Sequence, residues 1–149
     1  MGACCRYMYS YLDVRKYLPQ RDPFLFIDRI ISHEKNKYIN AQKIFKSDDV
    51  FLKGHFPGNP IIPGVILIEA MAQASGLILC DFKQKKSEKI VQGYLISSNT
   101  KFLKKLLPNN TVNIIMNVTL IADYIIKTSG FIEDKNKNLI AKGDISIAL

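Results

Sequence analysis

A stretch of twenty residues with almost no polar side chains, residues 61–80, constrains this chain more than any other part of its sequence. Its polar side chains are those of Glu69, Gln73 and Ser75. The length matches a bilayer span, but Pro63 and Gly64 interrupt the first turn, and a charge at Glu69 would be costly in lipid. A helix that is apolar on all sides is also typical of a protein interior. The stretch therefore predicts a buried helix over residues 64–81 and no membrane span.

Segments with the composition of β-strands lie on both sides of this helix. Before it, they are residues 24–31 and 38–45, with a polar break at 33–37 that suggests a hairpin. After it, they are residues 91–98, 112–121, 124–133 and 139–148, separated by polar turn segments. A capping box formed by Ser10 and Asp13 predicts a short helix over residues 11–18, which Pro19 would end.

The order of these elements predicts how they pack. An apolar helix needs cover on most sides, and a sheet wrapped around it supplies that cover. A length of 149 residues is typical of one folding unit. We therefore expect an α+β fold with a single domain over residues 1–149, in which an antiparallel sheet wraps around one long central helix. Residues 1–9 are expected to form a poorly ordered extension.

The net charge of +8 is concentrated in one part of the chain. Residues 83–105 contain seven lysines and one glutamate, a net charge of +6. A basic segment of this kind suits an anionic partner, which is a nucleic acid, a membrane surface or an acidic protein. A solvated lysine-rich loop without a partner explains the run equally well. Composition alone does not choose among these readings.

The cysteines do not form a recognisable metal or disulfide pattern. Cys4, Cys5 and Cys80 are an odd number, and none has the spacing of a metal site. With only two histidines in the chain, the sequence predicts no metal site. This use of cysteine fits a reducing cytosol, and the N-terminal residues show no secretory signal. The sequence therefore predicts a cytoplasmic protein.

A histidine lies in the most irregular part of the chain. Residues 54–64 hold three of the six prolines and three of the eight glycines, which predicts a rigid loop. His55 lies in this loop beside Phe56. A neutral imidazole is well suited to accept a proton near neutral pH, so His55 is a candidate general base. The alternative is a histidine that the loop backbone holds for structural reasons.

Glu69 is the second candidate for proton transfer. Burial in an apolar helix disfavours the charged form of a carboxyl and should raise its pKa, so that it can donate a proton. The catalytic glutamate of lysozyme is tuned in this way. A structural role is the alternative, in which Glu69 pairs with Arg21 or Arg29. Together, a loop histidine and a buried glutamate favour a general acid and base pair.

Two further residues border this pair. Gly64 lies at the start of the predicted helix, where unpaired amide groups and the helix dipole attract a developing oxyanion. It can equally serve only to permit the turn after Pro63. Gln73, one turn beyond Glu69, either orients the carboxylate or bonds another neighbour.

The block at residues 55–73 reads HFPGNPIIPGVILIEAMAQ and resembles the signature of the (3R)-hydroxyacyl-acyl-carrier-protein dehydratases of the FabZ type. The resemblance extends upstream through Leu18-Pro19, Arg21, Pro23-Phe24-Leu25 and Asp28-Arg29. It covers about nine-tenths of the chain.

The resemblance implies a hotdog fold and a homodimer in which His55 of one subunit faces Glu69 of the other, with dimers able to assemble into a trimer of dimers. It implies removal of water from a 3-hydroxyacyl thioester on the phosphopantetheine of acyl carrier protein, which gives the trans-2-enoyl thioester. His55 is then the base, Glu69 the acid and the Gly64 N–H the donor to the thioester oxygen, with Phe56 and Gln73 contacting the substrate. No metal or redox cofactor is implied.

The chain departs from the family pattern in two places. Gln20 and Asp22 stand where the family usually has His and Tyr, and Lys101-Phe102-Leu103-Lys104-Lys105 replaces an Arg-Phe-Arg-Arg-Pro segment. The pathway therefore stays open between fatty-acid synthesis and a dedicated lipid, polyene or polyketide pathway. Because acyl carrier proteins are typically acidic, Lys101, Lys104 and Lys105 are candidates for carrier docking.

Two other functions remain compatible with the sequence. One is an acyl-thioesterase on the same fold, which would hydrolyse the thioester with a carboxylate and water. The other is a non-catalytic acyl-binding subunit of a heterodimer, against which the presence of both catalytic residues argues. Nucleic-acid binding is not expected, because no recognition module is left over once this fold is assigned.

Overall fold

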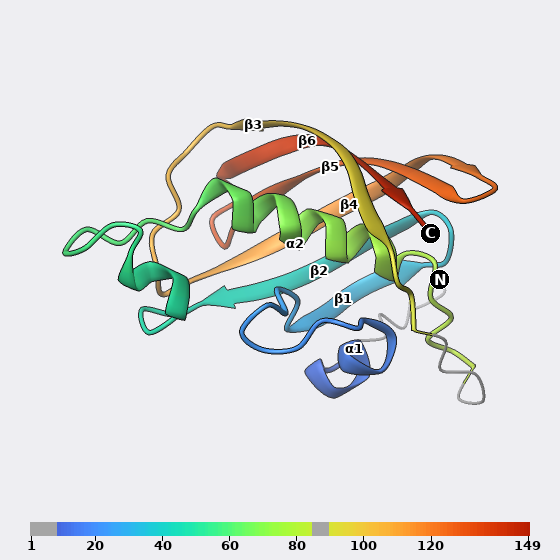
Figure 1. Cartoon of the computed structure of the whole chain (residues 1–149), viewed down its shortest axis with the longest axis horizontal. Coiled ribbons are helices and arrows are strands. Elements are labelled where there is room, and N and C mark those ends of the chain that lie inside the picture. Colours follow the sequence, from blue (N-terminus) through green and yellow to red (C-terminus); the bar gives the residue numbers. More distant parts are fainter. Residues whose placement is uncertain (1–8, 85–89) are drawn as a thin grey trace, which may run out of the picture.

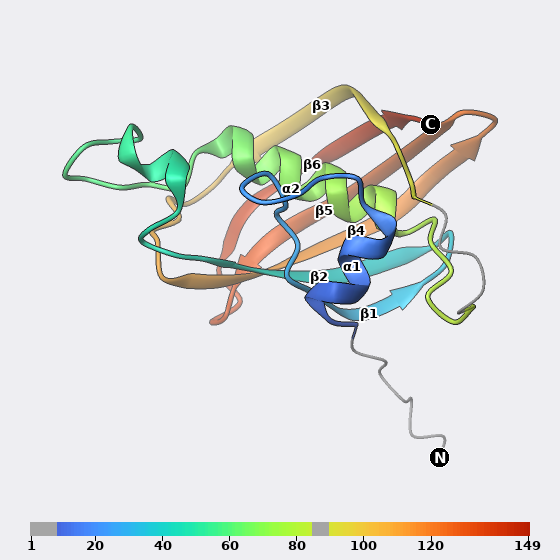
Figure 2. The same ribbon diagram turned by 60° about the horizontal axis from the view of Figure 1, so that its bottom comes forward.

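The computed structural model describes residues 9–84 and 90–149. The predicted N-terminal extension, apart from Tyr9, lies outside the described residues, and so do Cys4 and Cys5. Lys85, Lys86 and Lys89 of the basic segment also lie outside them. Within the described part, a six-stranded antiparallel sheet curves around one long helix, α2 (Figure 1, Figure 2).

The elements follow the predicted order. The helices are α1 (Tyr11–Tyr17), the 3₁₀ helix η1 (Val50–Lys53) and α2 (Gly64–Leu77). The strands are β1 (Arg29–Glu34), β2 (Tyr38–Phe45), β3 (Tyr94–Phe102), β4 (Asn110–Ala122), β5 (Ile125–Asp134) and β6 (Leu139–Ala148). They lie in the order β1-β2-β4-β5-β6-β3, so β1 and β3 form the two edges of the sheet. The capping box of Ser10 and Asp13 is present at the start of α1, as predicted.

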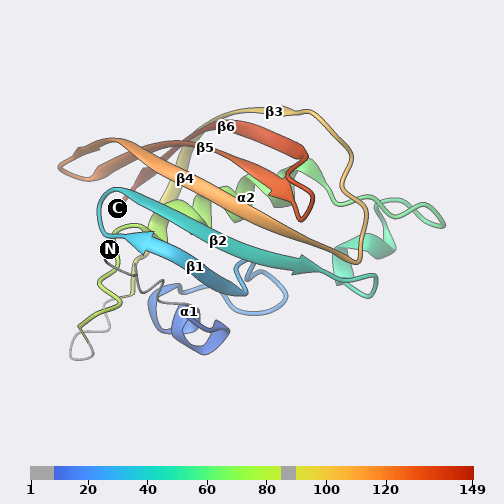
Figure 3. The ribbon, with the colours of Figure 1, turned by 180° about the vertical axis from the view of Figure 1, so that it is seen from behind.

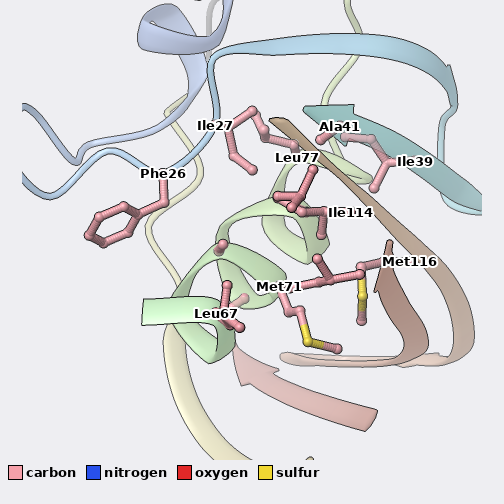
Figure 4. Packing of buried hydrophobic residues seen from close by; sticks show 14 of the residues in the cluster. Phe26, Ile27, Ile39, Ala41, Leu67, Met71, Leu77, Ile114 and Met116 are labelled. Atoms are coloured by element: carbon pink, nitrogen blue, oxygen red, sulfur yellow. The ribbon is translucent and has the colours of Figure 1, made fainter. Parts of the chain in front are cut away.

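The core lies between α2 and the concave face of the sheet. Side chains from α2, such as Leu67 and Met71, meet alternate residues of β4, such as Ile114 and Met116, and all four are almost fully buried (Figure 4). This alternation is expected when one face of a strand is buried. Figure 3 shows the opposite face of the sheet, which none of the described helices covers. The prediction of a buried helix within a wrapped sheet is confirmed.

Two glycines allow the sheet to curl tightly. Gly130 of β5 and Gly143 of β6 are direct cross-strand partners. A Cβ atom on Gly130 would lie 1.9 Å from the Ile115 carbonyl oxygen, and one on Gly143 would lie 2.4 Å from that of Asn99. Because a side chain at either position would collide with the neighbouring backbone, glycine is required where the sheet bends around α2.

The first predicted strand is wrong in its first half. Residues 24–28 are not a strand, and β1 begins at Arg29 and continues to Glu34. The reason is tertiary, because the Gln73 side chain of α2 occupies the backbone groups of Phe24 and Phe26 that a neighbouring strand would need. The turn after β1 covers residues 35–37 and is shorter than the predicted break at 33–37. Asn36 adopts a positive φ of 63° within this turn.

The other boundary errors of more than two residues lie at the end of α2 and in β3. The helix was predicted to reach residue 81 but ends at Leu77. Each of the next three backbone amides donates to the carbonyl oxygen three residues earlier, so the chain tightens into a 3₁₀ turn. Strand β3 was predicted over residues 91–98 but spans Tyr94–Phe102, so Lys101 lies in an edge strand paired with β6. Among the described residues, no helix is both long and apolar enough to cross a membrane.

Candidate active site

His55 lies in a loop that projects beyond the end of the sheet. The segment between η1 and α2 forms this projection (Figure 1). Its tip is closed by mutual backbone bonds between Phe56 and Asn59, and Gly58 supplies a positive φ of 74°. At its base, the Ile62 amide donates to the Leu106 carbonyl oxygen over 2.8 Å. These bonds give the loop the rigidity that its proline and glycine content predicts.

Two hydrogen bonds fix the orientation of His55. The Ile61 amide donates to the His55 carbonyl oxygen over 3.1 Å, and the His55 Nδ1 lies 2.9 Å from the Ile61 carbonyl oxygen. A carbonyl oxygen only accepts, so Nδ1 carries the proton and donates it. The Nε2 lone pair is therefore left for a proton from elsewhere. The ring of Phe56, which is half exposed, stacks on the imidazole with centroids 4.1 Å apart.

Glu69 is half-buried on the middle of α2, and Gln73 holds its carboxylate. The Gln73 Nε2 donates to Glu69 Oε1 over 3.0 Å. Burial raises the pKa of the Glu69 carboxyl above its usual range, and the hydrogen bond from Gln73 partly opposes that shift. The alternative in which Glu69 pairs with Arg21 is not seen. The Arg21 guanidinium donates instead to the carbonyl oxygens of Leu18 and Gln20.

Gln73 is almost fully buried, and its side-chain amide is fully engaged. Its Oε1 accepts from the Phe26 amide over 2.8 Å, while its Nε2 donates to the Phe24 carbonyl oxygen and to Glu69, each over 3.0 Å. Both roles left open for this residue are therefore present. It orients the carboxylate, and it fastens the segment before β1 to α2.

Gly64 is the first residue of α2, and Pro63 before it gives no side-chain cap. The first amides of a helix have no acceptor within that helix. The ring of Phe102, at the end of β3, packs against Gly64 so closely that a Cβ there would lie 2.8 Å from the ring. The helix therefore begins with amide groups beside the Phe102 ring, and a side chain at position 64 would push that ring aside.

A small hollow of about 40 Å³ lies beside Glu69. Segment 18–20, α2 and β3 enclose it, and Leu95 and Gly93 line its β3 side. His55 is not among its lining residues, so the two candidate catalytic side chains do not share this hollow within one subunit. Gln20 was predicted only as a departure from a family pattern, yet this residue lines the hollow with Glu69.

The lysines predicted to dock a carrier lie at the end of β3 and just after it. Lys101, Lys104 and Lys105 are all exposed. Lys101 is the direct cross-strand partner of Lys142 on β6, which adds a fourth positive charge. Like charges directly opposite each other destabilise a sheet unless an anion neutralises them.

Within the described part of the chain, no group of three or more histidine, cysteine or acidic side chains is arranged to hold a metal ion. Cys80 is buried and unpaired, and burial raises the pKa of its thiol to about 12. A thiol in that state is a poor nucleophile.

A curved antiparallel sheet around one helix defines the hotdog fold, and solved structures share it. A dehydratase heterocomplex, ApeI:P from Xenorhabdus doucetiae, aligns with a TM-score of 0.73 over 91% of this chain and 89% of that chain, at 21% identity. A hypothetical thioesterase with coenzyme A from Streptococcus pneumoniae TIGR4 aligns with a TM-score of 0.60 over 80% and 82%, at 12% identity. These likenesses show the fold.

The chain belongs to the FabA-like domain family, whose model matches residues 18–142. The 3-hydroxyacyl-[acyl-carrier-protein] dehydratase FabZ of Geotalea uraniireducens is 36% identical over 102 residues, 68% of this chain and 70% of the relative. The enzyme of the same name from Dichelobacter nodosus is 50% identical over 66 residues, 44% of this chain and 43% of the relative. The resemblance noted in residues 55–73 is confirmed at the level of the family.

Proposed function

We propose that this protein removes water from a 3-hydroxyacyl thioester carried on acyl carrier protein and forms the trans-2-enoyl thioester. The observation that carries the proposal is the presence, in one FabA-like chain, of two prepared proton-transfer groups. The Nδ1–H of His55 is committed, and no described residue bonds its Nε2 lone pair, while Glu69 is a half-buried carboxyl with a raised pKa. The relatives that carry the FabZ name support this choice of substrate.

The geometry supports a division of labour between these groups. A proton on the carbon next to a thioester is only weakly acidic, so removal by His55 Nε2 needs stabilisation of the carbonyl oxygen as enolate charge develops. The Gly64 N–H lies at the positive end of α2, where it would donate to that oxygen. Protonated Glu69 then gives its proton to the departing hydroxyl, directly or through water. Phe56 is half exposed beside His55, so its ring would contact the acyl thioester.

We propose that the working site is completed by a second copy of the chain. Strand β3 is an edge strand that exposes Tyr94, Leu95, Ile96 and Phe102. A long apolar edge of this kind favours pairing with another strand. Because Gly93 and Leu95 also line the hollow beside Glu69, a partner docked on β3 would lie next to that carboxyl, and its projecting loop could deliver His55 there. Pairing through β3 would form one continuous sheet across a two-fold axis.

Coexpression of two inactive variants tests the shared site. We expect His55→Ala and Glu69→Gln each to be inactive alone, and their mixture to recover about a quarter of wild-type activity, because half of randomly formed dimers are mixed and one of their two sites is intact. Activity is measured on purified mixed protein. A mixture as inactive as its components would contradict a site shared between subunits.

Turnover assays separate the proposed reaction from its competitor. Wild-type protein is given 3-hydroxyacyl and trans-2-enoyl thioesters on acyl carrier protein, and substrate and product are followed by mass while free thiol is followed with a colorimetric reagent. Interconversion without thiol release supports the dehydratase. Thiol release would identify a thioesterase, and binding without either reaction would identify a non-catalytic subunit.

Charge reversal at three lysines tests carrier docking. The triple variant with glutamate at positions 101, 104 and 105 should lose about tenfold or more in kcat/KM with carrier-bound substrate, because charged patches speed association by that order. Small thioesters that lack the carrier should react at the wild-type rate. Equal losses on both substrates would contradict docking at this surface.

A control variant matches the same change in net charge. Lys16, Lys37 and Lys137 are paired with carboxylates outside the basic segment. Their reversal to glutamate should leave turnover of carrier-bound substrate unchanged if the position of the charge matters.

The proposed reaction involves no metal or redox cofactor. The cytoplasmic location stays a prediction from the cysteine content.

A further inference from the structure

Two cavities of very different size lie along the second half of α2. The first is the hollow of about 40 Å³ beside Glu69, which Gly76 and Val91 also line. Gly76 lies about two helical turns beyond Glu69. The second cavity has a volume of about 450 Å³ and lies just past the end of the helix, where Val91, Leu79 and Cys80 line it. We call it the end cavity. Val91 thus belongs to the lining of both cavities.

The two volumes differ in what they can hold. An apolar cavity of about 150 Å³ holds one benzene molecule. The hollow beside Glu69 is much smaller than that, so it has room for only a few atoms. The end cavity is several times larger than the hollow, and most of its lining is apolar; its apolar and aromatic members are Tyr17, Leu79, Cys80, Ile90, Val91 and Leu149. By its size and lining, the end cavity suits the tail of an acyl chain.

The position of Val91 between the cavities is fixed by contacts on two sides. Its backbone amide donates to the Tyr17 carbonyl oxygen over 2.8 Å, which ties the start of the β3 segment to the end of α1. Its side chain faces α2, because a Cβ atom on Gly76 would lie 3.8 Å from Val91 Cγ1. A valine side chain is stiff about its first torsion angle. Its methyl group is therefore held over a position of α2 that has no side chain.

We propose that Val91 limits the length of the acyl chain, so that this protein prefers 3-hydroxyacyl thioesters with short chains. The inference rests on the proposed function, which places C3 of the substrate beside Glu69. Carbons beyond C3 then enter the hollow, and the hollow ends at Val91 after a few atoms. A second copy docked on β3 adds atoms around the hollow and removes none, so it does not lengthen this path. The end cavity stays out of reach behind the valine.

A series of chain lengths on one carrier tests the limit. Wild-type kcat/KM should be highest with 3-hydroxybutyryl thioester and should fall about tenfold or more by 3-hydroxyoctanoyl, because a hydrophobic pocket rejects a chain that exceeds its room by that order. Val91→Ala opens the way to the end cavity. In this variant, kcat/KM should rise about fourfold for each methylene group that reaches that cavity. The rate with 3-hydroxybutyryl thioester should stay at the wild-type value.

Gly76→Ala should change the profile in the opposite direction. The added methyl group fits, since its nearest neighbour would be Val91 Cγ1 at ordinary contact distance, and alanine is the better helix former. It takes up part of the hollow. We expect kcat/KM to fall about tenfold for 3-hydroxyhexanoyl thioester and to change little for 3-hydroxybutyryl. A merely structural role for either residue would move all chain lengths together.

Val118→Ala is the matched control. Val118 lies on β4 and, like Val91, is a partly buried valine packed against the core, but it lines neither cavity. This variant should keep the wild-type profile of chain lengths. Thermal unfolding of each variant checks that it is folded, and Gly76→Ala still decides the matter if Val91→Ala is unstable.

The outcomes separate this inference from the proposed function. Wild-type protein that converts short and long chains equally well would overturn the limit while leaving the dehydratase proposal intact. Profiles of Val91→Ala and Gly76→Ala that match that of wild type would do the same. Wild-type protein that converts no 3-hydroxyacyl thioester of any length would overturn both.

Discussion

His55→Ala should lower the rate of dehydration by about 10²–10⁴-fold, the usual contribution of a positioned general base. The Nδ1 bond to the Ile61 carbonyl oxygen leaves the Nε2 lone pair as the acceptor, and alanine has no group to accept the substrate proton. The fold should persist, because the loop is also closed by backbone bonds that the substitution does not touch. The measurement is kcat with a 3-hydroxyacyl thioester, together with exchange of its α-hydrogen in heavy water.

The second histidine gives the control. His33 is half-buried near the end of α2, where its Nε2 lies 3.1 Å from the Ile78 carbonyl oxygen, and burial lowers the pKa of its imidazole. His33→Gln should leave both the rate and the α-hydrogen exchange close to wild type. Turnover that survives in His55→Ala would contradict the assignment of the base.

Glu69→Gln should cost about as much, 10²–10⁴-fold, because the amide keeps the shape of the side chain but cannot donate the acid proton. The α-hydrogen exchange should persist in this variant, since His55 is intact. The two variants thus separate removal of the carbon proton from departure of the hydroxyl. Loss of exchange in Glu69→Gln would mean that the two proton transfers are not divided between these residues.

The pH profile of the wild-type enzyme should carry the mark of Glu69. Its pKa lies above the usual value because burial disfavours the charged form, so the protonated acid persists to higher pH than in a free glutamate. As pH rises through this raised pKa the acid form is lost and the rate declines. Glu69→Gln should show no such basic limb. Glu133→Gln is the control, because Glu133 lies on β5 and pairs with Lys137 outside the hollow.

The fold could be predicted largely because the pattern of apolar residues matched the final burial. Strands β2 and β6 have the predicted bounds, and α2 begins at the predicted glycine. The errors arise where partners distant in sequence decide the local structure. Residues 24–28 have the composition of a strand, but Gln73 binds their backbone groups, and no local pattern signals that contact.

The candidate site, like the fold, could be predicted only where local sequence decides the structure. His55 and Glu69 were predicted from their chemistry and from the loop and helix that carry them, because a histidine among prolines and a carboxylate in an apolar helix are unusual in themselves. The hollow that contains Gln20 could not be predicted, since it forms only when segment 18–20, α2 and β3 come together. The cross-strand contact of Lys101 with Lys142 likewise depends on strand register.

The hydrogen bonds of the Gln73 side-chain amide have two effects. The same amide fastens residues Phe24 and Phe26 to α2 and steadies the carboxylate of Glu69. Leu25, Phe26 and Ile27 of the same segment are almost fully buried in the core. Because segments with many buried apolar contacts open only together with the rest of the protein, the two backbone partners that fix the Gln73 amide stay in place as long as the core does. Loss of the oriented acid on heating should therefore coincide with unfolding of the protein as a whole.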